Sequence, residues 1–122
     1  MPEIIISNEM KKAFTQFRLS APILIALVDE ARQKIIEKLA EAGEEGVNVT
    51  DLSDGSELSR PAISHHLKVL KDAGLVATRK QGTQVFYRLQ LSSKMERLVG
   101  LKNAVETLIN KANRESKKTE EE

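Results

Sequence analysis

The chain of 122 residues contains no cysteine and no tryptophan, and aromatic residues make up only 3% of it. Without cysteine, a disulfide framework, a thiolate metal site and a redox-sensing thiol are all excluded. The longest apolar run, Ala21 to Val28, is less than half as long as a membrane-spanning helix. The N-terminal segment lacks the basic and apolar regions of a signal peptide. We therefore expect a cytoplasmic protein that has no membrane partner.

The residues that are present suffice for one modest core built from aliphatic side chains. Apolar residues make up 40% of the chain and charged residues 30%, which is typical of a globular protein. The length suits one domain rather than two, and we expect that domain over residues 1–115. Residues 116–122 are charged and contain no apolar residue, so we expect them to form a disordered acidic tail.

Hydrophobic residues recur at helical spacing through the first half of the chain. The pattern predicts helices over residues 8–18, 22–28, 30–42 and 50–56. Pro22 suits the first turn of the second helix, while Asp29 and Thr50 are candidate N-caps of the third and fourth. Gly43 is a candidate stop for the third helix. The short apolar run at residues 47–49 could form an edge strand.

The segment LSRPAISHHLKVLKDAGL, residues 58–75, predicts a helix with two different faces. Ser59 is its candidate N-cap, Pro61 fits the first turn, and Gly74 ends the helix. The apolar face has its residues at positions i, i+4 and i+7 and consists of Ile63, Leu67 and Leu70. The opposite face is basic and hydroxyl-bearing, and it consists of Arg60, Pro61, Ser64, His65, Lys68 and Lys71.

Two further elements follow this helix. Residues 75–78 and 84–89 are rich in Val, Phe, Tyr and Thr and flank a polar turn with Gly82, so they predict a β-hairpin. Ser93 and Glu96 form a capping-box pattern at the start of a long helix. Its apolar stripe repeats every three or four residues and consists of Met95, Leu98, Leu101, Val105, Leu108 and Ala112. A stripe this long at the chain end indicates a partner helix.

The order of helices, hairpin and final long helix is that of a winged helix-turn-helix. The block LSRPAISHHLKVLKDAGLV, with GTQVFYRL after it and ALVDEARQKIIEKLAEAG before it, resembles the ArsR family of bacterial transcriptional repressors. The resemblance covers residues 26–89 and includes a long C-terminal helix in the right place. It implies a mainly α-helical fold with a small β-hairpin wing and a C-terminal dimerisation helix. Residues 50–56 would form the positioning helix and residues 60–73 the recognition helix.

The residues themselves also favour DNA binding. Between residues 59 and 91, six basic residues stand against one acidic residue, a net charge of +5 in a chain of net charge +1. A recognition helix reads base edges in the major groove, and a basic hairpin tip can follow the backbone or enter the minor groove. The predicted DNA contacts are Ser59, Arg60, Pro61, Ser64, His65, Lys68, Lys71, Arg79, Lys80, Gln81, Thr83 and Gln84. The alternatives are a solvated helix face and an ordinarily polar hairpin tip, and we expect His66 to pack inward.

The resemblance implies a homodimer formed through the first and last helices. The apolar faces of these helices could be domain core or a dimer seam, and we favour the seam because one small domain offers no obvious cover. The predicted interface consists of Met10, Phe14, Phe17, Leu98, Leu101, Val105, Leu108 and Ala112. A two-fold dimer would present two recognition helices about 34 Å apart to a palindromic site.

The family's metal sensors use Cys on the positioning helix or Asp, His and Glu on the terminal helix. This chain has no Cys, and residues 92–122 contain no His or Asp. His65 and His66 are adjacent on a helix, so they point about 100° apart and cannot chelate as a pair. We expect no metal and no cofactor, and the inducer could be an organic small molecule, another signal or nothing. Glu57 stands where the family often has Gly or Asn, so either Glu57 is strained or the turn is built differently.

We predict a sequence-specific, double-stranded DNA-binding transcriptional regulator that acts as a homodimeric repressor at a palindromic operator. No catalysis is expected, because the chain shows no nucleophile motif and no phosphate-cradling Gly-rich loop. The alternative is a winged-helix protein-interaction module without sequence-specific DNA binding. The basic residues gathered on the recognition helix favour the regulator.

Overall fold

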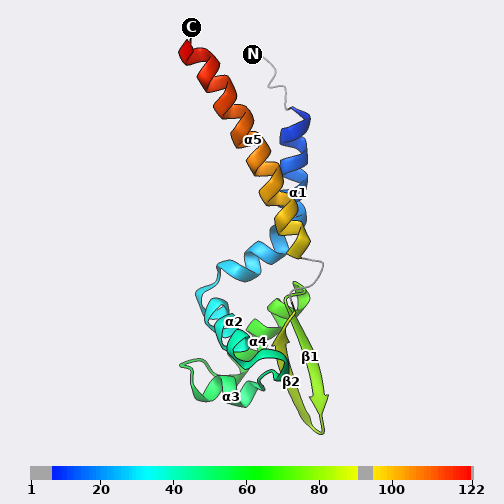
Figure 1. Ribbon diagram of the computed structural model, residues 1–122. Helices are drawn as coiled ribbons and strands as arrows, with labels where there is room; N and C mark the ends of the chain where they lie inside the picture. Colours follow the sequence, from blue (N-terminus) through cyan, green and yellow to red (C-terminus); the bar gives the residue numbers. More distant parts are fainter. Residues whose placement is uncertain (1–6, 91–94, 122) are drawn as a thin grey trace. The chain divides into compact units, whose positions relative to one another are not determined.

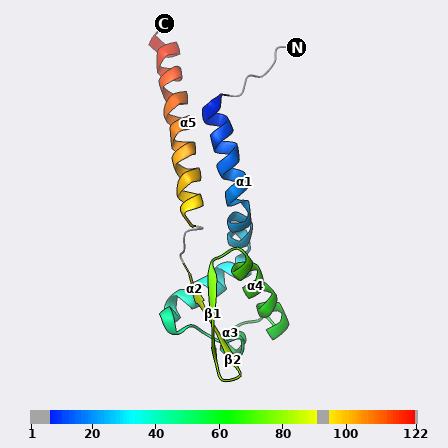
Figure 2. The same cartoon turned by 90° about the vertical axis from the view of Figure 1, so that its right-hand side faces the viewer.

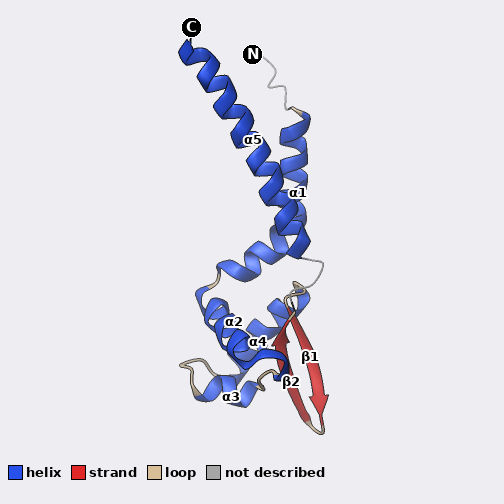
Figure 3. Cartoon of the chain, in the orientation of Figure 1, coloured by secondary structure: helices blue, strands red, loops and turns tan. Residues whose placement is uncertain are grey.

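A computed structural model of the chain describes residues 7–90 and 95–121. Its contacts divide the chain into two units, Pro22–Lys94 and Met1–Ala21 with Met95–Glu122, and each is described by itself. We call the first the winged unit and the second the helical unit. The described chain is mostly helical, with one antiparallel hairpin (Figure 3). The expected fold class, a winged helix-turn-helix with a long C-terminal helix, is confirmed.

The winged unit contains the end of α1 and five complete elements besides a short 3-10 turn (Figure 1). The elements are α1 (Asn8–Val28), α2 (Glu30–Ala42), η1 (Gly43–Glu45), α3 (Val49–Asp54), α4 (Arg60–Asp72), β1 (Val76–Gln81) and β2 (Gln84–Leu89). Its core is aliphatic, as the composition requires, and every helix of the unit contributes to it. The fully buried large side chains are Ile23, Leu39, Leu52, Ile63, Leu67 and Leu70. Burial of such side chains stabilises the fold by about 1.5–3 kcal/mol each.

Side-chain caps begin the three helices α2, α3 and α4. Asp29 Oδ1 accepts from the backbone N–H of Arg32 at 3.0 Å, and this bond, together with the Arg32 guanidinium, lowers the pKa of Asp29. Ser59 Oγ accepts from Ala62 N at 3.3 Å, as predicted. The prediction of Thr50 as the cap of α3 is wrong. Asn48 Oδ1 accepts from Asp51 N at 2.8 Å, so α3 begins before Thr50 and ends at Asp54.

The first predicted helix boundary is also wrong, because α1 is one helix across Pro22. A proline inside a helix removes one backbone donor and crowds the carbonyl four residues earlier, which is why the sequence suggested a new start there. The helix nevertheless continues through Pro22, from Asn8 to Val28. The predicted second helix, residues 22–28, is therefore the last part of α1.

The hairpin pairs β1 with β2 in a register that runs from Val76 opposite Leu89 to Gln81 opposite Gln84. Gly82, with a φ of 63°, opens the two-residue turn, where a positive φ matches the twist of the strands. The expected edge strand at residues 47–49 is present as a single bridge. Val47 and Tyr87 exchange backbone hydrogen bonds of 2.9 and 2.8 Å, which attach the loop before α3 to β2.

Gly46 lies beside this bridge and provides a stability test. Its φ is 79°, and a Cβ there would lie 2.6 Å from the backbone oxygen of Tyr87. Gly43 is the matched control, because its φ is 65° and a Cβ would meet nothing within 4 Å. We expect Gly43→Ala to cost about 1–3 kcal/mol from backbone strain, and Gly46→Ala to cost more because it also separates Val47 from Tyr87. Urea unfolding measures the free energy of unfolding of both variants. An equal decrease in the two would contradict the close contact between Gly46 and Tyr87.

The helical unit pairs the first part of α1 with α5 (Glu96–Glu121) in antiparallel fashion (Figures 1 and 2). Ser20 Oγ donates to Arg97 O at 3.1 Å, and at the other end Lys111 Nζ lies 3.6 Å from Glu9 Oε2. A backbone N–H at the start of α1 and the Lys111 ammonium both lower the pKa of Glu9. Ala13 and Ser20 are buried and lie on the face of α1 that meets α5.

The C-terminal predictions fall partly outside the described residues. Ser93, half of the expected capping box, lies there, whereas α5 runs to Glu121 and so enters the segment expected to be a tail. The division into a domain over residues 1–115 and a tail over residues 116–122 stays a prediction. No helix among residues 7–90 and 95–121 is long and apolar enough to cross a bilayer.

Candidate nucleic-acid interface

The recognition helix α4 separates its two faces as the sequence predicts. Ile63, Leu67 and Leu70 are buried with at most 1% of each residue exposed. The predicted contact residues on the other face are all exposed, and they are Ser59, Arg60, Pro61, Ser64, His65, Lys68 and Lys71. Gly74 has a φ of 79° just after the helix, which fits its predicted role as the stop. The basic and hydroxyl groups are therefore available to a partner rather than used in the core.

The turn between α3 and α4 answers the question raised by Glu57. No non-glycine residue in the described part of the chain has a positive φ, so Glu57 is not in the left-handed conformation. The turn is instead held by Ser56, whose backbone N–H donates to Ser53 O at 3.0 Å and whose Oγ accepts from Leu58 N at 3.0 Å. The two alternatives were a strained Glu57 and a turn built differently from the family's usual one, and the second is confirmed.

The tip of the wing is also exposed, and cross-strand pairing sorts its side chains onto two faces. Directly paired residues share a face of a two-stranded sheet. Arg79 and Gln81 therefore share a face with their partners Phe86 and Gln84, while Lys80 lies on the opposite face with Val85. All of the predicted wing contacts are exposed. The wing thus presents polar donors from both of its faces.

Arg79 has structural partners that the sequence did not reveal. Its guanidinium lies 4.6 Å from the centroid of the Phe86 ring, donates to Gln81 Oε1 at 2.8 Å, and donates to Glu45 O at 2.7 Å. These contacts link the wing to η1 and fix the side chain in one orientation. The strand register places Phe86 opposite Arg79. The predicted strands, residues 75–78 and 84–89, did not specify that register.

His66 lies on the inward side of α4, as expected. It is half-buried, and its Nδ1 lies 3.2 Å from Nη1 of Arg32 on α2. Arg32 is a buried cation with only 9% of its surface exposed, and no pattern in the sequence predicts its burial. Within the ranges 7–90 and 95–121, no group of three or more His, Cys, Asp or Glu side chains is placed to hold a metal ion.

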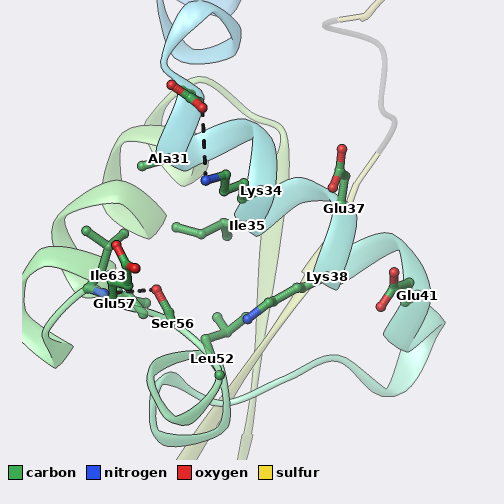
Figure 4. A pocket seen from close by; sticks show the side chains of 13 residues that line it. Ala31, Lys34, Ile35, Glu37, Lys38, Glu41, Leu52, Ser56, Glu57 and Ile63 are labelled. Carbon is green, nitrogen blue, oxygen red and sulfur yellow. Dashed lines mark hydrogen bonds and ion pairs between the residues drawn. The ribbon is translucent and has the colours of Figure 1, made fainter.

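A cleft of about 720 Å³ lies between α2 and the turn that leads into α4 (Figure 4). Ile35, Leu52 and Ile63 are among its apolar lining residues, and Lys38 extends across the cleft toward Leu52. Ser56 and Glu57 of the turn line the same cleft. A small molecule bound here would therefore contact the turn that sets the start of the recognition helix.

The comparisons with known proteins identify the family. A sequence profile described as bacterial regulatory protein, arsR family, matches residues 29–78. An uncharacterized HTH-type transcriptional regulator from Methanocaldococcus jannaschii is 40% identical over 72 residues, which cover 59% of this chain and 79% of that protein. This chain belongs to the ArsR family. The matched residues include the whole recognition helix and the start of the wing, so the resemblance found in the sequence is confirmed.

A further relative and two solved structures are also similar to this chain. The arsenical resistance operon repressor of Escherichia coli is 42% identical over 73 residues, which are 60% of this chain and 61% of the repressor. Among solved structures, an ArsR-like transcriptional regulator from Rhodococcus sp. RHA1 has a TM-score of 0.74 at 25% identity, covering 88% of this chain and 95% of that one. A homodimeric winged helix-turn-helix DNA-binding domain from Mycobacterium bovis has a TM-score of 0.58 at 25% identity, covering 86% and 91%.

Proposed function

We propose that this ArsR-family protein is a sequence-specific DNA-binding transcriptional regulator that binds a palindromic operator as a homodimer and represses transcription. The observation that carries the proposal is the exposed, basic face of α4, within a segment whose net charge is +5. The E. coli relative, an operon repressor, supports repression as the outcome. The protein acts in the cytoplasm, where its DNA target lies, and it performs no catalysis.

The residues of α4 and the wing divide into base readers and phosphate contacts. Arg60 lies at the first position of α4, where a recognition helix approaches base edges, and its guanidinium can pair bidentately with guanine. Ser64 and His65 follow on the same exposed face and can contact bases or phosphates. Lys68, Lys71 and the wing residues Arg79, Lys80, Gln81, Thr83 and Gln84 contact the backbone. These contacts supply affinity that depends on salt but not on sequence.

The helical unit supplies the dimer interface. Exposed apolar side chains remain on both of its helices, with Met10 at 37%, Phe14 at 49% and Phe17 at 56% on α1 and Val105 at 40% on α5. The α1 residues recur at i, i+4 and i+7 and so share one face of the helix, and an exposed apolar face is typical of a protein interface. The homodimeric state of the M. bovis domain supports the same assignment. The proposed interface also includes Leu98, Leu101, Leu108 and Ala112.

The proposal is tested by selecting binding sites from a random duplex library at moderate salt. We expect an enriched two-fold symmetric motif whose half-sites are separated by about one helical turn, because a two-fold dimer presents two recognition helices about 34 Å apart. The rival function is a winged-helix protein-interaction module. Weak binding that vanishes as the salt concentration rises, without any enriched motif, would reject the operator-binding function and favour that module.

A further inference from the structure

We propose that Arg32 is a positioning residue for DNA recognition, which sets the orientation of the recognition helix through its hydrogen bond to His66. This inference rests on the proposed function and concerns residues that do not themselves face DNA. Arg32 lies in the first turn of α2, and its guanidinium reaches both the end of α1 and the inward side of α4. All of these groups belong to the winged unit.

Arg32 first closes the C-terminal end of α1. The last four carbonyls of a helix have no partner within the helix and need donors from elsewhere. Arg32 Nε donates to Ala26 O at 2.8 Å and Nη2 donates to Ile25 O at 3.0 Å. The neighbouring Gln33 donates through Nε2 to Leu27 O at 2.8 Å. The first turn of α2 thus holds the last turn of α1 through three hydrogen bonds to its terminal carbonyls.

The remaining arm of the guanidinium faces α4. Nη1 lies 3.2 Å from His66 Nδ1 and 3.8 Å from Asp29 Oδ2. A guanidinium has only donors, so this hydrogen bond requires His66 Nδ1 to accept, which places the ring hydrogen on Nε2. Because Arg32 is buried and bonded on several sides, its guanidinium is a fixed point to which His66 is attached.

The hydrogen bond at His66 is directional and can fix the rotation of α4, whereas the apolar contacts of α4 are not directional. Ile63, Leu67 and Leu70 pack the helix against the core, but apolar contacts are non-directional and allow small rotations of the helix about its axis. A binding site must hold its contact groups within about 0.5 Å and 10–20° of the working geometry. His66 directly follows the exposed residue His65, so fixing His66 fixes the rotation of the adjacent DNA-facing positions.

The test compares His66→Leu with His66→Asn in the full-length chain. Leu has no acceptor, whereas Asn Oδ1 keeps an acceptor near the place of Nδ1. The measured quantity is the ratio of the dissociation constant for random duplex to that for the selected operator duplex. The ratio is determined at a temperature where circular dichroism and light scattering show all proteins folded in the same oligomeric state. Because Lys68, Lys80 and the other phosphate-contacting residues are unchanged, we expect His66→Leu to lower this ratio about tenfold and His66→Asn to keep it.

The outcomes separate this inference from the proposed function. A wild-type ratio near one overturns the proposed function, and the positioning role with it. A high wild-type ratio that His66→Leu leaves unchanged overturns the positioning role alone, as does an equal loss in both variants. If His66→Leu does not fold, nitrogen NMR of the wild-type His66 ring provides the second measurement. The neutral form with hydrogen on Nε2 supports the bond, and hydrogen on Nδ1 contradicts it.

Discussion

Val105→Glu is expected to convert the proposed dimer to a monomer. Val105 lies in α5 with 40% of its surface exposed, so a carboxylate there is solvated in the monomer but buried and unpaired across the proposed seam. The structure makes this position a cleaner test than Leu101 or Leu108. Those residues are half-buried within the helical unit itself, and a charge there would also destabilise the monomer. Light scattering measures the mass directly.

The matched control is Asn103→Glu, which adds the same charge to an exposed polar position on another side of α5. We expect this variant to stay dimeric. Loss of the dimer should also weaken operator binding by about 100-fold or more, because two linked half-site contacts become independent ones. If Val105→Glu keeps the mass of a dimer, that part of α5 lies outside the interface.

The recognition helix could be predicted almost completely from sequence because its determinants are local. Ser59 caps it, Pro61 lies in its first turn, and the spacing of Ile63 and Leu67 fixes its buried face. Each of these signals acts over one to four residues and does not depend on the rest of the fold. The same is true of the hairpin turn, where Gly82 supplies the positive φ.

The errors and omissions arise where a local signal competes with tertiary structure. Pro22 looks like a helix start but is an interior residue of α1, and Asn48 replaces Thr50 as a cap because the helix begins before Thr50. Arg79 is predicted from the sequence only as a DNA contact, and nothing in the sequence singles out Arg32, because their structural roles depend partly on distant partners. His66 lies 34 residues from Arg32 and Glu45 lies 34 residues from Arg79, and only the fold brings each pair together.

The candidate site also combines features that local sequence signals predict with features that depend on the fold. The exposure of the predicted DNA-facing residues follows from helical periodicity and from the polar hairpin tip, and the structure agrees at every one of them. Exposure alone does not give each residue its role. Arg79 is exposed yet already bonded to Glu45 and stacked on Phe86, whereas Lys80 lies on the opposite face of the hairpin. Roles within the wing therefore depend on register, which the sequence left open.

Arg60→Ala is expected to relax base preference at one position in each half-site. A bidentate contact between arginine and guanine contributes about 1–3 kcal/mol of discrimination, so selectivity at that position should fall by about fivefold to 150-fold. Arg60 is exposed at the first position of α4 and has no structural role in the cap, which Ser59 supplies. Repeating the selection with the variant shows the change directly. An unaltered motif would mean that Arg60 does not read a base.

Lys80→Ala is the contrasting variant, because it removes a charge from the wing without removing a base reader. It should weaken binding to all sequences alike. The slope of the logarithm of the binding constant against the logarithm of the salt concentration should also become shallower, by about one for each wing. The selected motif should stay the same. If Lys80→Ala changed the motif and Arg60→Ala changed only the salt slope, the assignment of α4 to base recognition and of the wing to phosphate contact would have to be reversed.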